Sequence, residues 1–116
     1  MDGNRAEPLE DLLLWRGELG ELLAALRQRP PDSVAVFRRT HAAAAAEKAA
    51  LGGVGAEELT AWAQAVHFEE AVEIETGCED LLTQFLVEVS TPELFEPVTV
   101  EVCQRWLHAL GTAPEH

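Results

Sequence analysis

Apolar residues recur at helical spacing in separate segments of this chain. Two segments follow the i, i+3, i+4, i+7 spacing of a single helix face: Leu59, Trp62, Ala63 and Val66, and then Cys103, Trp106, Leu107 and Leu110. The composition supports the same interpretation, because Tyr is absent and Ile74 is the one isoleucine. Strands favour β-branched and aromatic residues, whereas helices favour Ala and Leu. The pattern therefore predicts a mostly helical fold.

Proline and glycine divide this pattern into segments. Gly17 and Gly20 allow a break in the first expected helix, because each weakens a helix interior by about 1 kcal/mol relative to Ala. Asp32 or Ser33 is expected to cap the second helix and Thr99 the last one. Helices are expected over residues 8–28, 32–51, 56–67, 79–89 and 100–111.

Residues 68–77 form the least helical part of the chain. Val72 and Ile74 alternate with Glu73 and Glu75, as in a strand. A short strand without a partner is not stable alone, so we expect an extended acidic connector here. Residues 90–93 read Ser-Thr-Pro-Glu, which resembles a capping box that opens a short helical turn ending near Phe95.

The predicted fold class is thus all-α, a small bundle of four to five helices with short loops and one extended acidic connector. The length of 116 residues suits one ordinary domain. We therefore expect residues 1–116 to form a single helical domain with frayed ends at 1–7 and 112–116.

Charge is distributed unevenly along the chain. The formal net charge is −13. Residues 1–51 hold 8 acids and 7 bases, whereas residues 52–116 hold 13 acids and one base, Arg105, which gives the second part a net charge of −12. Such a field repels nucleic acid and anionic membranes and attracts basic surfaces. Acidic surfaces also serve solubility alone, so both interpretations stay open at this point.

The two cysteines, Cys78 and Cys103, are expected to be free thiols. Residues 1–10 are polar and do not resemble a signal peptide, and the apolar run at 42–46 is too short to span a bilayer. These features favour a cytoplasmic location, where thiols stay reduced. Cys103 falls on an apolar helix face and is expected in the core.

No motif for catalysis or for a cofactor stands out. The glycine-rich loop at 52–55 precedes a helix but follows no strand, and Glu57 and Glu58 would repel a phosphate there. His67, Cys78 and the acids between them lack a recognised metal-ligand spacing. Ser33 and Ser90, the only serines, both suit helix caps. We therefore expect a protein that is not an enzyme and binds no cofactor and no metal.

The stretches at 58–63, 66–67, 72–75, 80–82 and 90–95 resemble small, acidic helical proteins of actinobacterial genomes. They are similar in style to helical immunity proteins, which neutralise toxin nucleases. This resemblance implies an inhibitor that binds a basic toxin. The colicin-type immunity family carries a Tyr-Tyr pair that contacts its toxin, and this chain has no Tyr. No functional residue is carried over from that family.

Two functions from different classes follow. The first is a non-catalytic, acidic binding protein that captures a basic protein partner such as a toxin nuclease, and binds neither nucleic acid nor membrane. The second is a structural module in which the Leu-rich 8–28 and Ala-rich 32–51 helices form a homodimer interface. For the first function, we expect the partner to contact acids of the connector and the following helix, with one aromatic anchor: Glu69, Glu70, Glu73, Glu75, Glu79, Asp80 and Trp62.

Overall fold

The computed structural model describes residues 8–28 and 34–111, and within them the first expected helix is divided in two. Helix α1 (Pro8–Leu14) and helix α2 (Leu19–Leu26) are separated by a turn at Trp15, with φ 53°, and Gly17, with φ 110°. Positive φ values are readily adopted by glycine and cost energy in other residues. The break that Gly17 allowed is therefore present, whereas Gly20 lies inside α2.

The expected helix over residues 32–51 is wrong at its start. Ala35–Phe37 form strand β1, which pairs in parallel with strand β2 (Val72–Ile74). Part of the expected connector is therefore a strand, and β1 is the partner that the sequence did not reveal. The helix that was expected over residues 32–51 is α3, which begins only at Arg39 and runs to Ala50. The expected caps at 32 and 33 and the frayed ends at 1–7 and 112–116 lie outside the described residues.

The later helices agree more closely with the sequence pattern. They are α4 (Ala56–His67), α5 (Glu79–Ser90) and α6 (Val100–Gly111). Thr99 caps α6 as predicted, since its Oγ1 accepts a hydrogen bond from the Val102 N–H at 3.2 Å. The predicted capping box at 90–93 is wrong, because Ser90 and Thr91 both donate their hydroxyls to the Val87 carbonyl at the end of α5. A 3₁₀ turn, η1 (Pro92–Leu94), follows.

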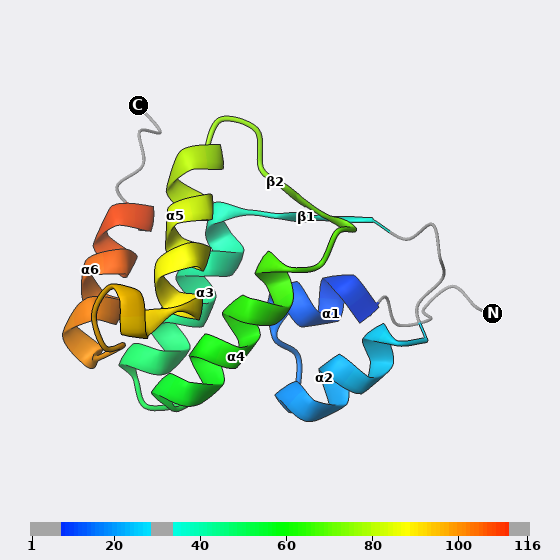
Figure 1. Cartoon of the computed structure of the whole chain (residues 1–116), viewed down its shortest axis with the longest axis horizontal. Helices are drawn as coiled ribbons and strands as arrows, with labels where there is room; N and C mark the ends of the chain where they lie inside the picture. The colour runs from blue at the N-terminus through cyan, green and yellow to red at the C-terminus, as the bar shows by residue number, and fades with distance from the viewer. Residues whose placement is uncertain (1–7, 29–33, 112–116) are drawn as a thin grey trace.

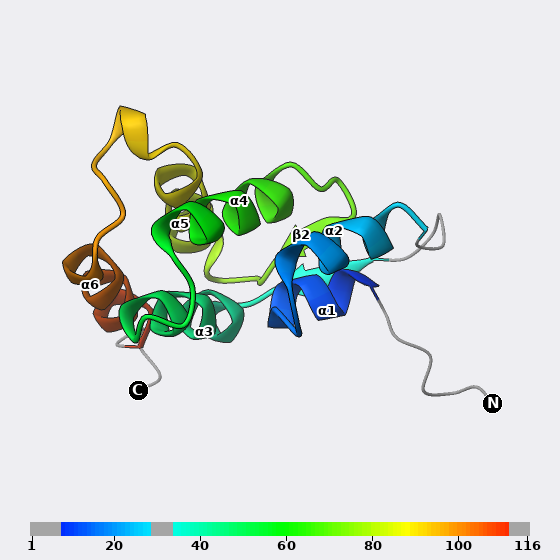
Figure 2. The same cartoon turned by 90° about the horizontal axis from the view of Figure 1, so that it is seen from below.

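Four of the helices form two packed pairs. Helix α3 packs against α6, and α4 packs against α5 (Figure 1). The second view shows these pairs as two layers, with the segment that joins α5 to α6 standing out from the body of the protein (Figure 2). We call this segment, residues 91–99, the arm. The fold is mostly helical, with six α-helices and a two-stranded parallel sheet in the described part of the chain.

One hydrophobic core joins the elements, and its centre is aromatic. Trp62 is 0% exposed, stacks on Trp15 with ring centroids 5.2 Å apart, and meets the edge of Phe37 at 5.8 Å. The Trp62 Nε1–H donates to the Leu12 carbonyl at 2.7 Å, which ties α4 to the end of α1. Aromatic pairs in these geometries contribute stability beyond their buried area. None of the helices described is long and apolar enough to cross a membrane.

Candidate partner-binding surface

The predicted acidic residues do not all have the same role. Glu70 and Glu73 are exposed, as expected of contact residues. Glu75 instead accepts a hydrogen bond from the Arg39 N–H at 2.8 Å, so its carboxylate caps the start of α3. Glu79 is exposed, and its Oε1 accepts from the Gly77 N–H at 3.0 Å within its own turn. Glu69 is half-buried at the turn after α4. Part of the acidic segment therefore holds the fold together.

Asp80, the last of the predicted acids, lies at one end of a groove on the outer face of α5. The groove has a volume of about 530 Å³. Steps of about 100° per residue place Asp80, Gln84 and Glu88 on one side of the helix. The groove, which we call the α5 groove, is lined by Asp80, Thr83, Gln84, Val87, Glu88 and, from the arm, Phe95.

The arm supplies exposed apolar side chains that are not among the contact residues predicted from the sequence. Leu94 is 73% exposed and Phe95 is 50% exposed. Their neighbours Pro92 and Pro97 bracket the segment, and proline fixes φ and donates no backbone hydrogen bond. Adjacent exposed apolar side chains that are rimmed by polar residues are typical of interaction surfaces, whereas single ones are common on any protein. A signal was present in the sequence: Leu94 and Phe95 are apolar residues between two prolines and outside any helical stripe.

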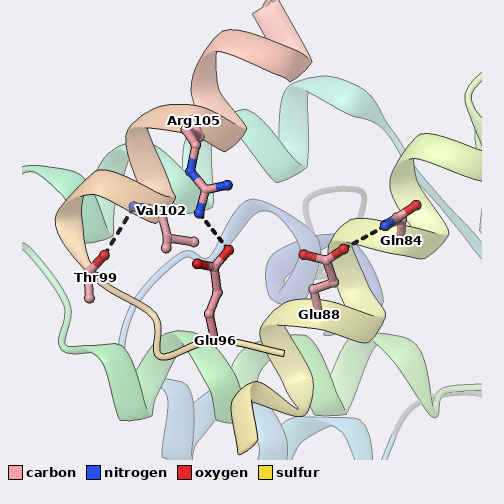
Figure 3. Close-up of polar contacts among 6 residues, drawn as sticks. All are labelled: Gln84, Glu88, Glu96, Thr99, Val102 and Arg105. Atoms are coloured by element: carbon pink, nitrogen blue, oxygen red, sulfur yellow. Dashed lines mark hydrogen bonds and ion pairs between the residues drawn. The ribbon is translucent and has the colours of Figure 1, made fainter. Parts of the chain in front are cut away.

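Arg105, the one basic residue among residues 52–116, forms an ion pair with an acid of the same part of the chain. Arg105 Nη2 donates to Glu96 Oε2 at 2.5 Å (Figure 3). The pKa of Arg105 is raised by this hydrogen bond, by the charge of Glu96 and by the charge of Glu88. In the same view Gln84 Nε2 donates to Glu88 Oε2 at 2.6 Å. The cation therefore reduces the negative field near the arm without removing it.

Trp62 was expected to be an aromatic anchor, and the structure places it elsewhere. Its side chain is 0% exposed and its one hydrogen-bond donor is used by Leu12. A side chain with no exposed surface makes no contact with a partner in this conformation. Trp62 therefore belongs to the core, and the exposed aromatic residues beside acids in the described part of the chain are Phe68, which is 71% exposed and precedes Glu69, and Phe95.

The other reactive side chains are arranged as structural groups. His41 is buried, its Nδ1 accepts from the Arg38 N–H at 2.9 Å, and burial lowers its pKa below the usual 6.5. Cys103 is 2% exposed and burial raises its pKa, whereas Cys78 is half-buried; both are free thiols. Within residues 8–28 and 34–111, no group of three or more His, Cys, Asp or Glu side chains is placed to hold a metal ion.

Comparisons of this chain with protein-family models, with curated proteins and with solved structures find no match.

Proposed function

We propose that the protein is a non-catalytic binding protein of the immunity type, which captures a basic protein partner such as a toxin nuclease. The observation that carries this proposal is the α5 groove, in which the half-exposed ring of Phe95 lies with the carboxylates of Asp80 and Glu88. An apolar anchor supplies binding energy, and surrounding charges supply steering and specificity.

The charge of the surrounding surface supports a basic partner in particular. Residues 52–116 carry a net charge of −12, and their one base, Arg105, is paired with Glu96. Glu70 and Glu73 add exposed carboxylates on the segment before α5. An acidic protein that must reach a basic toxin before the toxin reaches nucleic acid gains from long-range attraction.

The alternative function, self-assembly through the Leu-rich and Ala-rich helices, has less support. The apolar faces of those helices are used inside the fold, where Leu9, Leu12, Ala42, Ala45 and Ala46 are all buried. The described residues therefore offer little of these faces to a second copy. Measurement of mass in solution separates the two functions, since self-assembly requires a stable dimer.

The proposal is tested by affinity capture from the native host with matched baits. The test bait carries Asp80→Lys and Phe95→Ala. The control bait carries Glu47→Lys and Leu51→Ala, which change an exposed acid and an exposed apolar residue at the end of α3. We expect the wild type and the control to retain the same basic protein, and the test bait to lose it. Capture of no basic protein, or equal capture by all three baits, would contradict the proposal.

A further inference from the structure

A second groove lies between the arm and the first turn of α4. Its volume is about 450 Å³. We call it the α4 groove, and it is distinct from the α5 groove because the two share no residue. Most of its lining is apolar, but two carboxylates face it as well. The lining residues are Ala56, Glu57, Thr60, Pro92, Glu93, Pro97 and Val98.

The carboxylates of this groove are available to a ligand. Helix α4 is capped at Gly55, whose N–H donates to Glu58 Oε1 at 3.0 Å, so Glu58 is used within the turn. Glu57 and Glu93 are both exposed, and among the described residues neither carboxylate accepts a hydrogen bond or forms an ion pair. The groove thus combines apolar walls with two carboxylates that have no partner in the described part of the chain.

Two prolines limit the backbone freedom of the wall that the arm supplies. Pro92 and Pro97 have fixed φ angles, and neither has a backbone N–H to satisfy. Val98, which is half-buried, packs against the hydrophobic core. A groove that keeps its shape loses little conformational entropy when a side chain enters it.

We infer that the α4 groove receives a Lys or Arg side chain of the basic partner. This inference rests on the proposed function and names the second contact that the partner makes. The aliphatic stem of such a side chain packs on Pro92, Pro97 and Val98, while its charged end reaches Glu57 and Glu93. Long cationic side chains commonly bury their stems on apolar surface in this way. Hydrogen bonds between such a cation and carboxylates are stronger than neutral ones.

Other occupants fit the groove less well. An apolar side chain would cover the walls but would make no contact with the two exposed carboxylates, which would keep water as their one partner. An anionic group would be repelled by both carboxylates. The combination of walls and charges therefore selects a cation with an apolar stem.

In the test, a short peptide with one central Arg among Gly and Ser residues is added to the full chain. Binding is measured from the changes in the amide chemical shifts of the protein. A second peptide replaces Arg with citrulline, which keeps the shape without the charge, and a third replaces it with Leu. We expect the Arg peptide to shift the amides of Ala56, Thr60 and Val98. The citrulline and Leu peptides should bind at least about tenfold more weakly, because they lack the charged hydrogen bonds.

Two double variants locate the contact. Glu57→Gln with Glu93→Gln should weaken the Arg peptide about tenfold. Glu21→Gln with Glu47→Gln, which neutralises two exposed acids outside the groove, should leave these shifts unchanged. Equal binding of the Leu peptide, or shifts confined to residues 80–88, would overturn the inference and leave the proposed function standing. If the Arg peptide shifts no amide of residues 56–111 and no basic protein is captured, both are wrong.

Discussion

The buried indole of Trp62 gives the sharpest test of the fold. In Trp62→Phe, the hydrogen bond from Nε1 to the Leu12 carbonyl is lost, and a part of the ring that packs between Trp15 and Phe37 is removed. The Leu12 carbonyl keeps the Trp15 N–H at 3.0 Å as a second donor. No acceptor is left without a partner, so no additional desolvation cost is expected.

The size of the effect follows from these contacts. The lost hydrogen bond contributes about 1 kcal/mol to the free energy of unfolding. Besides the indole nitrogen, whose hydrogen bond is counted above, Phe lacks about two of the buried carbons of Trp, and at about 0.8 kcal/mol per buried methylene they contribute roughly 2 kcal/mol. Trp62→Phe should therefore lower the free energy of unfolding by about 3 kcal/mol, which is a large part of the roughly 5–15 kcal/mol of an ordinary domain.

The assay is urea unfolding followed by far-ultraviolet circular dichroism. Trp106→Phe is the control, since Trp106 is only half-buried and meets Phe85 edge-on at 5.2 Å. We expect Trp106→Phe to cost clearly less than Trp62→Phe. A loss below about 1 kcal/mol for Trp62→Phe, the size of one ordinary hydrogen bond, would refute the central position of Trp62.

Further predictions concern pH, backbone conformation and thiol reactivity. Because burial lowers the pKa of His41 below 6.5, the unfolded chain binds the proton more readily. The stability contributed by neutral His41 should therefore be complete above pH 6.5 and be lost as pH falls through the lower native pKa. Urea unfolding at pH values on both sides of 6.5 should show that the free energy of unfolding falls with pH, and His41→Asn should remove this part of the pH dependence. Gly17→Ala should destabilise by about 1 kcal/mol or more because φ is 110° there, whereas Gly20→Ala in α2 should stabilise by about 0.5–1 kcal/mol; equal effects in thermal unfolding would contradict the turn. In the native protein Cys103 should react more slowly with a thiol reagent than Cys78, and both should react at similar rates in urea; fast native reaction of Cys103 would place it outside the core.

The helical parts of the fold were predictable where apolar spacing was regular and the boundaries were local. Helix α4 ends where its stripe fades, at His67, and Thr99 caps α6 through its own side chain. The strand at 35–37 was not predictable in this way. Its pairing with residues 72–74 joins segments 37 residues apart in sequence. Val36 and Phe37 are residue types that strands favour, but so short a strand is not stable without its distant partner.

The candidate surface was predictable in charge but not in detail. The excess of acid in residues 52–116 is visible in the sequence, and Glu70, Glu73 and Asp80 are exposed as a contact role requires. The capping role of Glu75 depends on Arg39, 36 positions away. Spacing along one segment carries no sign of such a contact. The apolar stripe that contains Trp62 likewise shows that this side chain faces the core or a partner without showing which.

The central claim is that the acidic half of the chain captures a basic protein, and its most direct test is the association rate as a function of ionic strength. The partner is the basic protein that wild type retains, and the variant carries Glu70→Lys, Glu73→Lys and Asp80→Lys. These side chains are exposed, so thermal stability should change little, and their fields are screened over about 8 Å at physiological salt. We expect the variant to associate more slowly than wild type at low salt and to show a flatter dependence on salt. Equal rates and equal salt slopes for the two proteins would contradict the claim.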